Sequence, residues 1–339
     1  MSNFIVTGCA GFIGSHLSER LLKDGHRVLG VDDMSTGTQE NLDLLTNNKA
    51  FTFAQIDISK TDDIIRLDRI IQVFNKVTEF GPIDGVFHTA ALARIQPAIL
   101  NPQRCHEINV TGIFNILEVM RMCKIPNIVF SSSSSIYGLL NKPPLKESMS
   151  PDCLNPYSLS KFIGEKMIQT WCKLYDLRGV SLRYFNVYGP REVLNAGQYS
   201  PVLGLFYQQA LKDKQRMTIV GDGRQTRDMT HVYDVVEANV KAMEKCMSPN
   251  HMMLGPQFNV GTGSNISVLN LAKSIQMNLL QQGVKVDYVH IQPRPGEATD
   301  TMADISGTKY HLDWEPKISL STGLAWQMIY YLDKYGYNK

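Results

Sequence analysis

The chain has 339 residues, 43% hydrophobic and 19% charged, which is the composition of a globular protein with room for one large and one smaller domain. Its 34 basic and 32 acidic side chains leave a net charge of +2, which gives no reason to expect nucleic acid or a membrane surface as partner. The six cysteines and eight histidines lack metal-ligand spacing, so we expect no metal and a reducing, cytoplasmic location. We expect no membrane span or signal peptide, because no apolar run of about 18 residues occurs and the first predicted strand begins almost at Met1.

The first predicted element is a strand at residues 4–7 that leads into a glycine-rich turn and a helix. The glycines, spaced G-x-x-G-x-x-G, are Gly8, Gly11 and Gly14. In such a turn the first glycine permits a tight bend, the second lets the backbone approach a pyrophosphate, and the third lets helix and strand pack closely. A second strand ends in Asp32, an acid placed to bind an adenosine ribose and to repel a 2′-phosphate. The pattern predicts a dinucleotide site that prefers NAD to NADP.

Apolar strand-like runs then alternate with helical patterns, which is typical of a parallel sheet. The further predicted strands are residues 51–58, 85–91, 127–130 and 179–184, and the predicted helices are residues 62–78, 102–123 and 156–174. The predicted fold class is α/β, a Rossmann-type doubly wound parallel sheet with a smaller α/β substrate-binding lobe. We expect residues 1–186 to form the nucleotide-binding domain, with 226–259 returning to it, and 187–225 and 260–339 to form mainly the smaller lobe.

Tyr157 and Lys161 are four residues apart on a predicted helix and therefore share one face. A free phenol has a pKa near 10, so a base working near pH 7 needs that pKa lowered by roughly three units, or about 4 kcal/mol. The Lys161 ammonium and a bound nicotinamide cation would together favour the phenolate. The serine run 131–135 precedes this helix at the end of a predicted strand, which is where active sites lie in doubly wound sheets.

With these residues in place, the chain resembles the extended short-chain dehydrogenases/reductases along nearly its whole length. Within that family it is most similar to NAD-dependent nucleotide-sugar epimerases of the UDP-glucose and UDP-N-acetylglucosamine 4-epimerase type. The matching motifs are residues 7–14, 57–58, 88–91, 109–112, 131–138, 156–161, 182–190, 227–232 and 293–297.

The resemblance implies a role for each matching residue. Tyr157 would be the acid/base, Lys161 the ligand of the cofactor ribose, and Ser133 the hydroxyl that binds the reacting sugar oxygen, although Ser132 or Ser134 fits with a register shift of one. The implied cofactor-binding residues are Gly8, Gly11, Phe12, Ile13, Gly14, Asp32, Asp57, Ile58, Ala90, Ala91, Asn109, Tyr157, Lys161 and Tyr184. The implied substrate-binding residues are Ser133, Asn186, Arg227, Arg294 and Thr301. Arginines suit forked contacts with a diphosphate.

The serine run indicates which reaction to expect. Dehydratases that resemble the chain carry Thr-Asp-Glu there, because water elimination needs an extra acid and base, whereas this chain has Ser133, Ser134 and Ser135. A tyrosine, a lysine and a serine suffice for reversible alcohol oxidation. We therefore expect a UDP-sugar 4-epimerase that uses NAD, a transient 4-keto sugar and Tyr157 as acid/base.

The sugar itself is predicted from a position that, in similar 4-epimerases, lies behind the C2 substituent. Thr301 occupies it here, and its small side chain predicts UDP-N-acetylglucosamine as well as, or in preference to, UDP-glucose. UDP-glucuronate also fits, with Arg191 or Arg94 as partner of its carboxylate. Two further functions are compatible with the same residues: a net NAD-dependent dehydrogenase or reductase of a nucleotide sugar, and a catalytically silent NAD-binding scaffold.

The same resemblance predicts a homodimer, because helices 102–123 and 156–174 are similar to those that pair across a two-fold axis in the family. The apolar residues expected at that interface are Ile113, Ile116, Leu117, Met120, Ile163, Met167, Trp171 and Leu174. The expected small-molecule partner is the UDP-sugar substrate.

Overall fold

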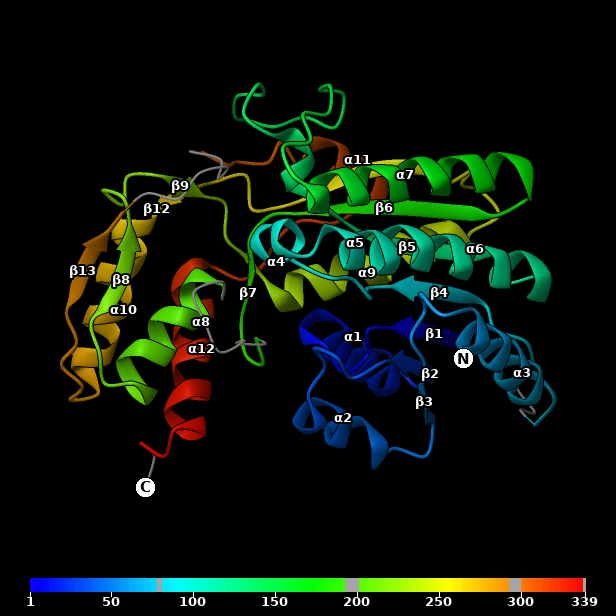
Figure 1. The fold of residues 1–339 in the computed structure, drawn as a ribbon, viewed down its shortest axis with the longest axis horizontal. Coiled ribbons are helices and arrows are strands. Elements are labelled where there is room, and N and C mark those ends of the chain that lie inside the picture. The colour runs from blue at the N-terminus through cyan, green and yellow to red at the C-terminus, as the bar shows by residue number, and fades with distance from the viewer. Residues whose placement is uncertain (78–80, 193–200, 293–299, 338–339) are drawn as a thin grey trace.

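A parallel sheet of seven strands forms the centre of the fold in the computed structural model, which describes residues 1–77, 81–192, 201–292 and 300–337 (Figure 1). The strand order is β11-β6-β5-β4-β1-β2-β3, and every neighbouring pair is parallel. The strands are β1 (Asn3–Thr7), β2 (Arg27–Asp32), β3 (Phe51–Gln55), β4 (Gly85–His88), β5 (Asn127–Ser133), β6 (Arg178–Tyr184) and β11 (Leu254–Val260). The order reverses between β1 and β4, the switch point at which doubly wound sheets bind ligands. The predicted Rossmann-type doubly wound α/β class is confirmed.

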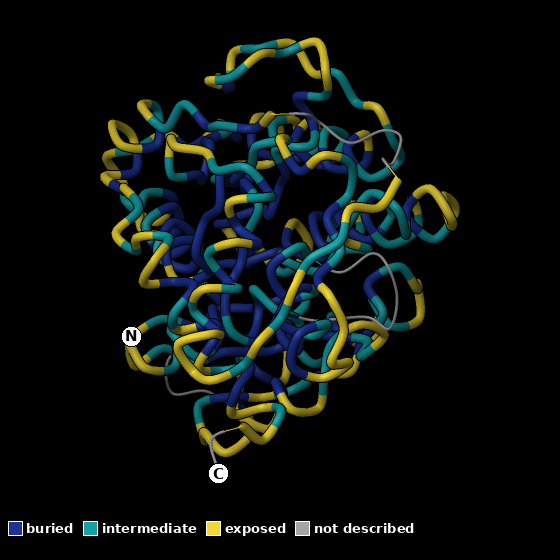
Figure 2. The backbone as a smooth tube through the Cα atoms, turned by 90° about the vertical axis from the view of Figure 1, so that its left-hand side faces the viewer, coloured by how far each residue is buried: buried dark blue, intermediate teal, exposed yellow. Residues whose placement is uncertain are grey.

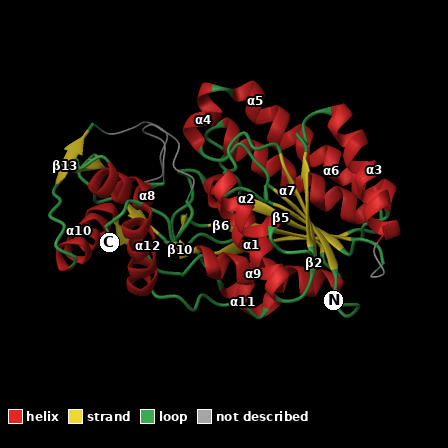
Figure 3. Cartoon of the chain, turned by 90° about the horizontal axis from the view of Figure 1, so that it is seen from below, coloured by secondary structure: helices red, strands yellow, loops and turns green. Residues whose placement is uncertain are grey.

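Helices cover both faces of this sheet (Figure 3). One face carries α1 (Phe12–Lys23), α2 (Gln39–Thr46), α9 (Val232–Met247) and α11 (Ser306–Leu312). The other carries α3 (Thr61–Val77), α6 (Gly112–Cys123) and α7 (Pro156–Leu174), with α4 (Ile95–Leu100) and α5 (Pro102–His106) leading into α6. Because both faces are covered, β1, β4 and β5 are buried along their whole length, which explains their continuous apolar runs.

The helix predicted at 102–123 is one helical path with an irregular centre. Between α5 and α6 lies a π-helical turn, η1 (Glu107–Thr111), which carries Asn109. The Asn109 side chain accepts a hydrogen bond from the backbone N–H of Leu92 at 2.8 Å and donates one to Ser160 Oγ at 2.9 Å. This turn therefore links the segment after β4 to the first turns of α7.

A smaller lobe packs beside the sheet around its own apolar core and lies at the left of Figure 1. Its elements are α8 (Val202–Tyr207), the π-helical turn η3 (Gln208–Lys212), β8 (Met217–Val220), α10 (Val268–Gln281), β13 (Tyr288–Ile291) and α12 (Leu320–Lys334). Two short strand pairs connect it to the sheet: β7 (Val187–Tyr188) with β10 (Thr230–His231), and β9 (Thr226–Arg227) with β12 (Ile266–Ser267). Within the range 260–339, Leu312 and Trp314 instead join the core of the sheet.

Buried backbone fills the interior in Figure 2, and exposed segments lie around it. The apolar stripe of α6 belongs to that interior, because Ile113, Ile116, Leu117 and Met120 are all buried in the core between α6 and the sheet. The expectation that these four residues form a dimer interface is therefore wrong: they face the chain's own sheet. No helix in the described ranges is long and apolar enough to cross a membrane.

Candidate active site

A cavity of about 600 Å³ lies at the carboxyl ends of the strands and extends toward the smaller lobe. The predicted site residues that line it are Gly8, Gly11, Phe12, Ile13, Gly14, Asp32, Asp57, Ile58, Ala90, Ala91, Ser133, Tyr157, Tyr184, Asn186, Arg227 and Thr301. Asn109 and Lys161 do not line it. Arg294 lies outside the described residues.

The glycine-rich turn has the shape that a pyrophosphate requires. Gly8 has φ +73°, and a Cβ there would lie 2.8 Å from the backbone nitrogen of Ala90. A Cβ on Gly14 would lie 2.0 Å from the Gly8 oxygen, so only glycine lets α1 approach β1 this closely. No side chain caps the N-terminus of α1 at Gly11, which leaves its first backbone N–H groups available to an anion. The turn therefore fits a dinucleotide.

Two carboxylates, from the ends of β2 and β3, line the far end of the cavity. Asp32 accepts backbone hydrogen bonds from Ala10 at 2.9 Å and Met34 at 2.8 Å, and its burial raises its pKa. Burial alone would raise the pKa of Asp57 as well, but hydrogen bonds from Ser59 and Arg104 bring it below its usual value. Two fixed acids at this end suit ribose hydroxyls and oppose a 2′-phosphate.

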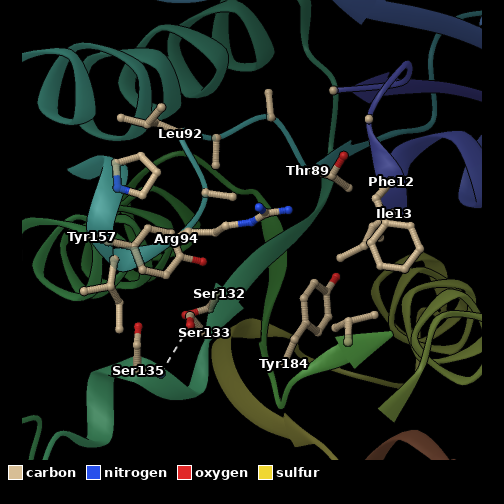
Figure 4. A pocket seen from close by; sticks show the side chains of 18 of the residues that line it. Phe12, Ile13, Thr89, Leu92, Arg94, Ser132, Ser133, Ser135, Tyr157 and Tyr184 are labelled. Carbon is tan, nitrogen blue, oxygen red and sulfur yellow. Dashed lines mark hydrogen bonds between the residues drawn. The ribbon is translucent and has the colours of Figure 1, made fainter. Parts of the chain in front are cut away.

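The three serines at the end of β5 point in different directions. Ser131 Oγ lies 3.0 Å from Tyr184 Oη, and Ser132 Oγ donates to the buried carboxylate of Glu165 at 2.6 Å. Ser133 lines the cavity beside Tyr157, and its hydroxyl accepts a hydrogen bond from the backbone N–H of Ser135 (Figure 4). The hydroxyls of Ser131 and Ser132 are bound to other side chains, which leaves Ser133 as the serine of this strand available to the phenol.

Tyr157 stands in the first turn of α7, whose start is fixed by local sequence. Asn155 accepts from the backbone N–H of Ser158 at 2.9 Å, the Ser158 side chain accepts from the Asn155 backbone, and Pro156 occupies the first helical position. This capping box sets where the helix begins and so where its first side chains point. Tyr157 is thereby held in the wall of the cavity.

Lys161 lies one turn further on and is buried. Its ammonium is 5.9 Å from the Tyr157 ring centroid and donates to the backbone oxygen of Ser131 at 2.8 Å. Burial lowers the pKa of Lys161 to about 8. Burial also raises the pKa of Tyr157, while the Ser133 hydroxyl and the charge of Arg94 act in the opposite direction. In the protein alone, Lys161 does not supply the expected lowering of the phenol pKa, and burial dominates.

Asn186 and Thr301 meet at the opposite wall. Thr301 Oγ1 accepts from Asn186 Nδ2 at 3.2 Å and from the backbone N–H of Asp228 at 3.3 Å. Asp228 is fully buried and also accepts from the backbone N–H groups of Thr262 and Ala303, at 2.7 and 3.0 Å. The buried carboxylate thus gathers the three loops that form this wall, next to the cavity-lining Arg227.

The two arginines considered as carboxylate partners lie in different places. Arg94 lines the cavity beside Tyr157 and has φ +84°, a conformation that a non-glycine residue adopts at an energetic cost (Figure 4). Arg191 is buried against His16 and Glu19 and lines a separate groove between α1 and α12. The expectation that Arg191 could reach the sugar is therefore wrong.

Sequence reasoning missed two residues that organise the site. Glu165 follows Tyr157 and Lys161 at a further spacing of four and so continues the same helix face. That spacing was a signal in the sequence. Arg104 bonds Asp57 at 2.9 Å and lies 3.6 Å from Asp33, a contact between segments distant in sequence that carries no local signal.

The doubly wound sheet, the glycine-rich turn and the Tyr157–Lys161 helix define a nucleotide-binding protein of the short-chain dehydrogenase/reductase type. A sequence model of the family described as GDP-mannose 4,6 dehydratase matches residues 5–326, and the chain belongs to this family.

Relatives of this chain carry epimerase names. The UDP-glucose 4-epimerase of Mycolicibacterium smegmatis is 33% identical, with 97% of this chain and 98% of that protein covered. The structure of Thermotoga maritima UDP-glucose 4-epimerase with UDP-glucose is 32% identical with a TM-score of 0.86, covering 98% and 99%. That of Bacillus cereus UDP-glucuronic acid 4-epimerase with UDP-glucuronic acid and NAD is 31% identical with a TM-score of 0.84, covering 98% and 100%. The resemblance to nucleotide-sugar epimerases is thus confirmed.

Proposed function

We propose that the protein is an NAD-dependent 4-epimerase of UDP-sugars. The observation that carries the proposal is that Tyr157 and Ser133 line the same cavity, where Ser134 and Ser135 stand in place of the acid and base that water elimination needs. This set supports removal and return of a proton at one hydroxyl. It is the chemistry of reversible oxidation at the sugar C4.

One group of residues would carry out proton transfer, and another would bind the nucleotide. Ser133 holds the sugar 4-oxygen, and Tyr157 removes its proton and later returns it. The glycine-rich turn and the two strand-end acids would hold NAD, which would supply reversible hydride transfer at C4. Arg227 and Asn186 grip the nucleotide diphosphate at the other wall and leave the sugar free to turn between the two transfers.

Thr301 supports a sugar with a large C2 substituent. Its side chain is small and its hydroxyl is bound to Asn186 and Asp228, so it leaves room at this wall of the cavity. We propose UDP-N-acetylglucosamine, UDP-glucose or both as substrates. The direct test is turnover of each sugar, followed by proton NMR at the anomeric position, with NAD measured after denaturation of the purified protein. Absence of both bound NAD and a C4-inverted product would overturn the proposal.

UDP-glucuronate is a second candidate, which the place of Arg94 favours. Thr301 lies against Asn186. Arg94 lies beside Tyr157, the residue that we propose to act at C4. In a hexopyranose C4 is bonded to C5, which carries C6, whereas the diphosphate is at C1 across the ring. A cation beside Tyr157 is therefore suited to a carboxylate at C6.

The charge of Arg94 can be tested with a methionine of similar length. Arg94→Met should lower kcat/KM for UDP-glucuronate by roughly 10- to 150-fold, the value of a hydrogen bond to a charged group, and leave UDP-glucose turnover unchanged. An equal loss of kcat/KM for both sugars would show that Arg94 does not discriminate between them.

A further inference from the structure

Glu165 is a fully buried acid next to the site, and the proposed chemistry does not use it. Its side chain is 1% exposed and forms a two-pronged ion pair with Arg183, with Arg183 Nε at 2.8 Å and Nη2 at 2.7 Å. One of its oxygens also accepts the Ser132 hydroxyl at 2.6 Å. A fully buried carboxylate with three donors has one stable position.

The strand register explains why Glu165 acts on Ser132 and not on Ser133. Ser132 on β5 pairs with Arg183 on β6, so their side chains share the face that α7 covers. Successive residues of a strand point to opposite faces, and Ser133 therefore points away from Glu165. The hydrogen bond from Ser132 to Glu165 therefore fixes which side of the sheet each serine side chain points to at the end of β5. The 3-10 turn η2 (Ser134–Tyr137) follows directly.

Helix α7, which carries Glu165, also carries Tyr157 and Lys161. Tyr157, Lys161 and Glu165 lie at successive intervals of four along α7, and two of them bond the end of β5: Lys161 to the Ser131 oxygen and Glu165 to Ser132. Both contacts are buried, so they hold α7 and β5 at a fixed distance. The separation between the Tyr157 phenol and the Ser133 hydroxyl depends on that distance.

We propose that Glu165 is a positioning residue for the reaction, acting through Ser132 to keep Ser133 in hydrogen-bond reach of Tyr157. This inference rests on the proposed function, because it assigns Ser133 and Tyr157 to one sugar oxygen. Glu165 does not line the cavity, whereas Ser132 lines it beside Ser133. The effect of Glu165 on turnover therefore passes through Ser132 and Ser133.

The test is a double-mutant cycle of Ser132→Ala and Ser133→Ala. Ser132→Ala removes the link and keeps the Glu165–Arg183 ion pair, whereas Glu165→Gln leaves a buried charge unpaired and endangers folding. Ser132→Ala should lower kcat roughly 10-fold with little change in KM, within the range that misplacement of a reacting group costs. In the Ser133→Ala background the same substitution should change kcat less than about 2-fold, because the group it positions is gone.

A second readout needs no turnover. The nearby Ser133 hydroxyl lowers the pKa of Tyr157, so Ser132→Ala should raise that pKa in the native background and leave it unchanged in Ser133→Ala. It is measured by ¹³C NMR of labelled tyrosine, with Tyr157→Phe assigning the signal. The matched control is Ser181→Ala, a buried serine on the neighbouring strand β6, which should change neither quantity.

Equal effects of Ser132→Ala in both backgrounds, or an effect no larger than that of Ser181→Ala, would overturn the inference. An inactive wild-type protein whose Tyr157 titration still follows the cycle would instead overturn the proposed function and leave the positioning role standing.

Discussion

Lys161 donates a hydrogen bond from Nζ to the backbone oxygen of Ser131 at 2.8 Å, and this contact ties the helix that carries Tyr157 to strand β5. The ammonium also lies 5.0 Å from the ring centroid of Phe130 and is almost fully buried. The Lys161 ammonium is therefore held against strand β5, outside the cavity lining, and forms no hydrogen bond with the Tyr157 phenol in the described structure.

The buried charge of Lys161 predicts a pH dependence of stability. Burial lowers its pKa from 10.5 to about 8, so between these values the folded protein binds fewer protons than the unfolded chain. The contribution of Lys161 is thus least favourable below about pH 8 and improves as pH rises toward 10.5. The pKa difference corresponds to about 3 kcal/mol.

Urea denaturation of the cofactor-free protein at pH 7.5 and 10.5 measures this effect. The change in unfolding free energy between the two pH values should be about 3 kcal/mol more favourable in the native protein than in Lys161→Met. Identical changes in the two proteins would mean that Lys161 titrates as it does in water.

Tyr157→Phe should abolish turnover and leave NAD bound, because it removes only the ionisable oxygen. General acid/base contributions run to 10²–10⁴-fold, so the variant should retain less than about one hundredth of the native rate. The steady-state rate and the NAD released on denaturation are measured together. Ser133→Ala should cost less and Ser134→Ala least. Retention of more than about a tenth of the rate would remove Tyr157 from the role of base.

Thr301→Tyr should make the enzyme discriminate against 2-acetamido sugars. A tyrosine ring at this wall crowds a packed site, which typically costs 1–3 kcal/mol, or roughly a 5- to 150-fold lower kcat/KM for UDP-N-acetylglucosamine. UDP-glucose lacks the acetyl group and should be little affected. Because Thr301 also bonds Asn186, Thr301→Ser is the matched control that keeps the hydroxyl. Equal losses on both sugars would give Thr301 a structural role only.

The protein should form a homodimer through the outward faces of α6 and α7. With the inward stripe of α6 in the core, exposed apolar side chains remain at Met122, Leu159 and Leu174 and at Phe114, which is 42% exposed and packs edge-on against Trp171 at a centroid distance of 5.9 Å. Light scattering at micromolar concentration should give the mass of two chains, and Phe114→Glu should reduce it to one. Met277→Glu, an exposed apolar site on α10, should leave the mass unchanged. A monomeric native protein would contradict this prediction.

The sheet and the glycine-rich turn could be predicted because their signals are local. Gly8 and Gly14 stand where the chain passes too close to itself for a side chain, and Asp32 ends a strand that its own apolar run predicts. Helix periodicity is equally local, but it shows only which residues share a face. It could not show that Ile113 and Met120 contact the chain's own sheet.

Long-range packing decided the remaining positions. Arg94 and Arg191 were equivalent candidates in the sequence, and only the tertiary structure brings the first into the cavity and pairs the second with His16 and Glu19. The backbone of Arg94 at φ +84° is likewise set by its surroundings, since the residue itself does not favour that conformation.

The central claim is that one hydride leaves C4 and returns to the opposite face of the same sugar. A UDP-sugar deuterated at C4, incubated with the purified protein in ordinary water and followed by NMR and mass spectrometry, tests it directly. We expect a C4-inverted product that retains the deuterium, with no NADH accumulating. Loss of deuterium to solvent, or accumulation of a keto product with NADH, would contradict it.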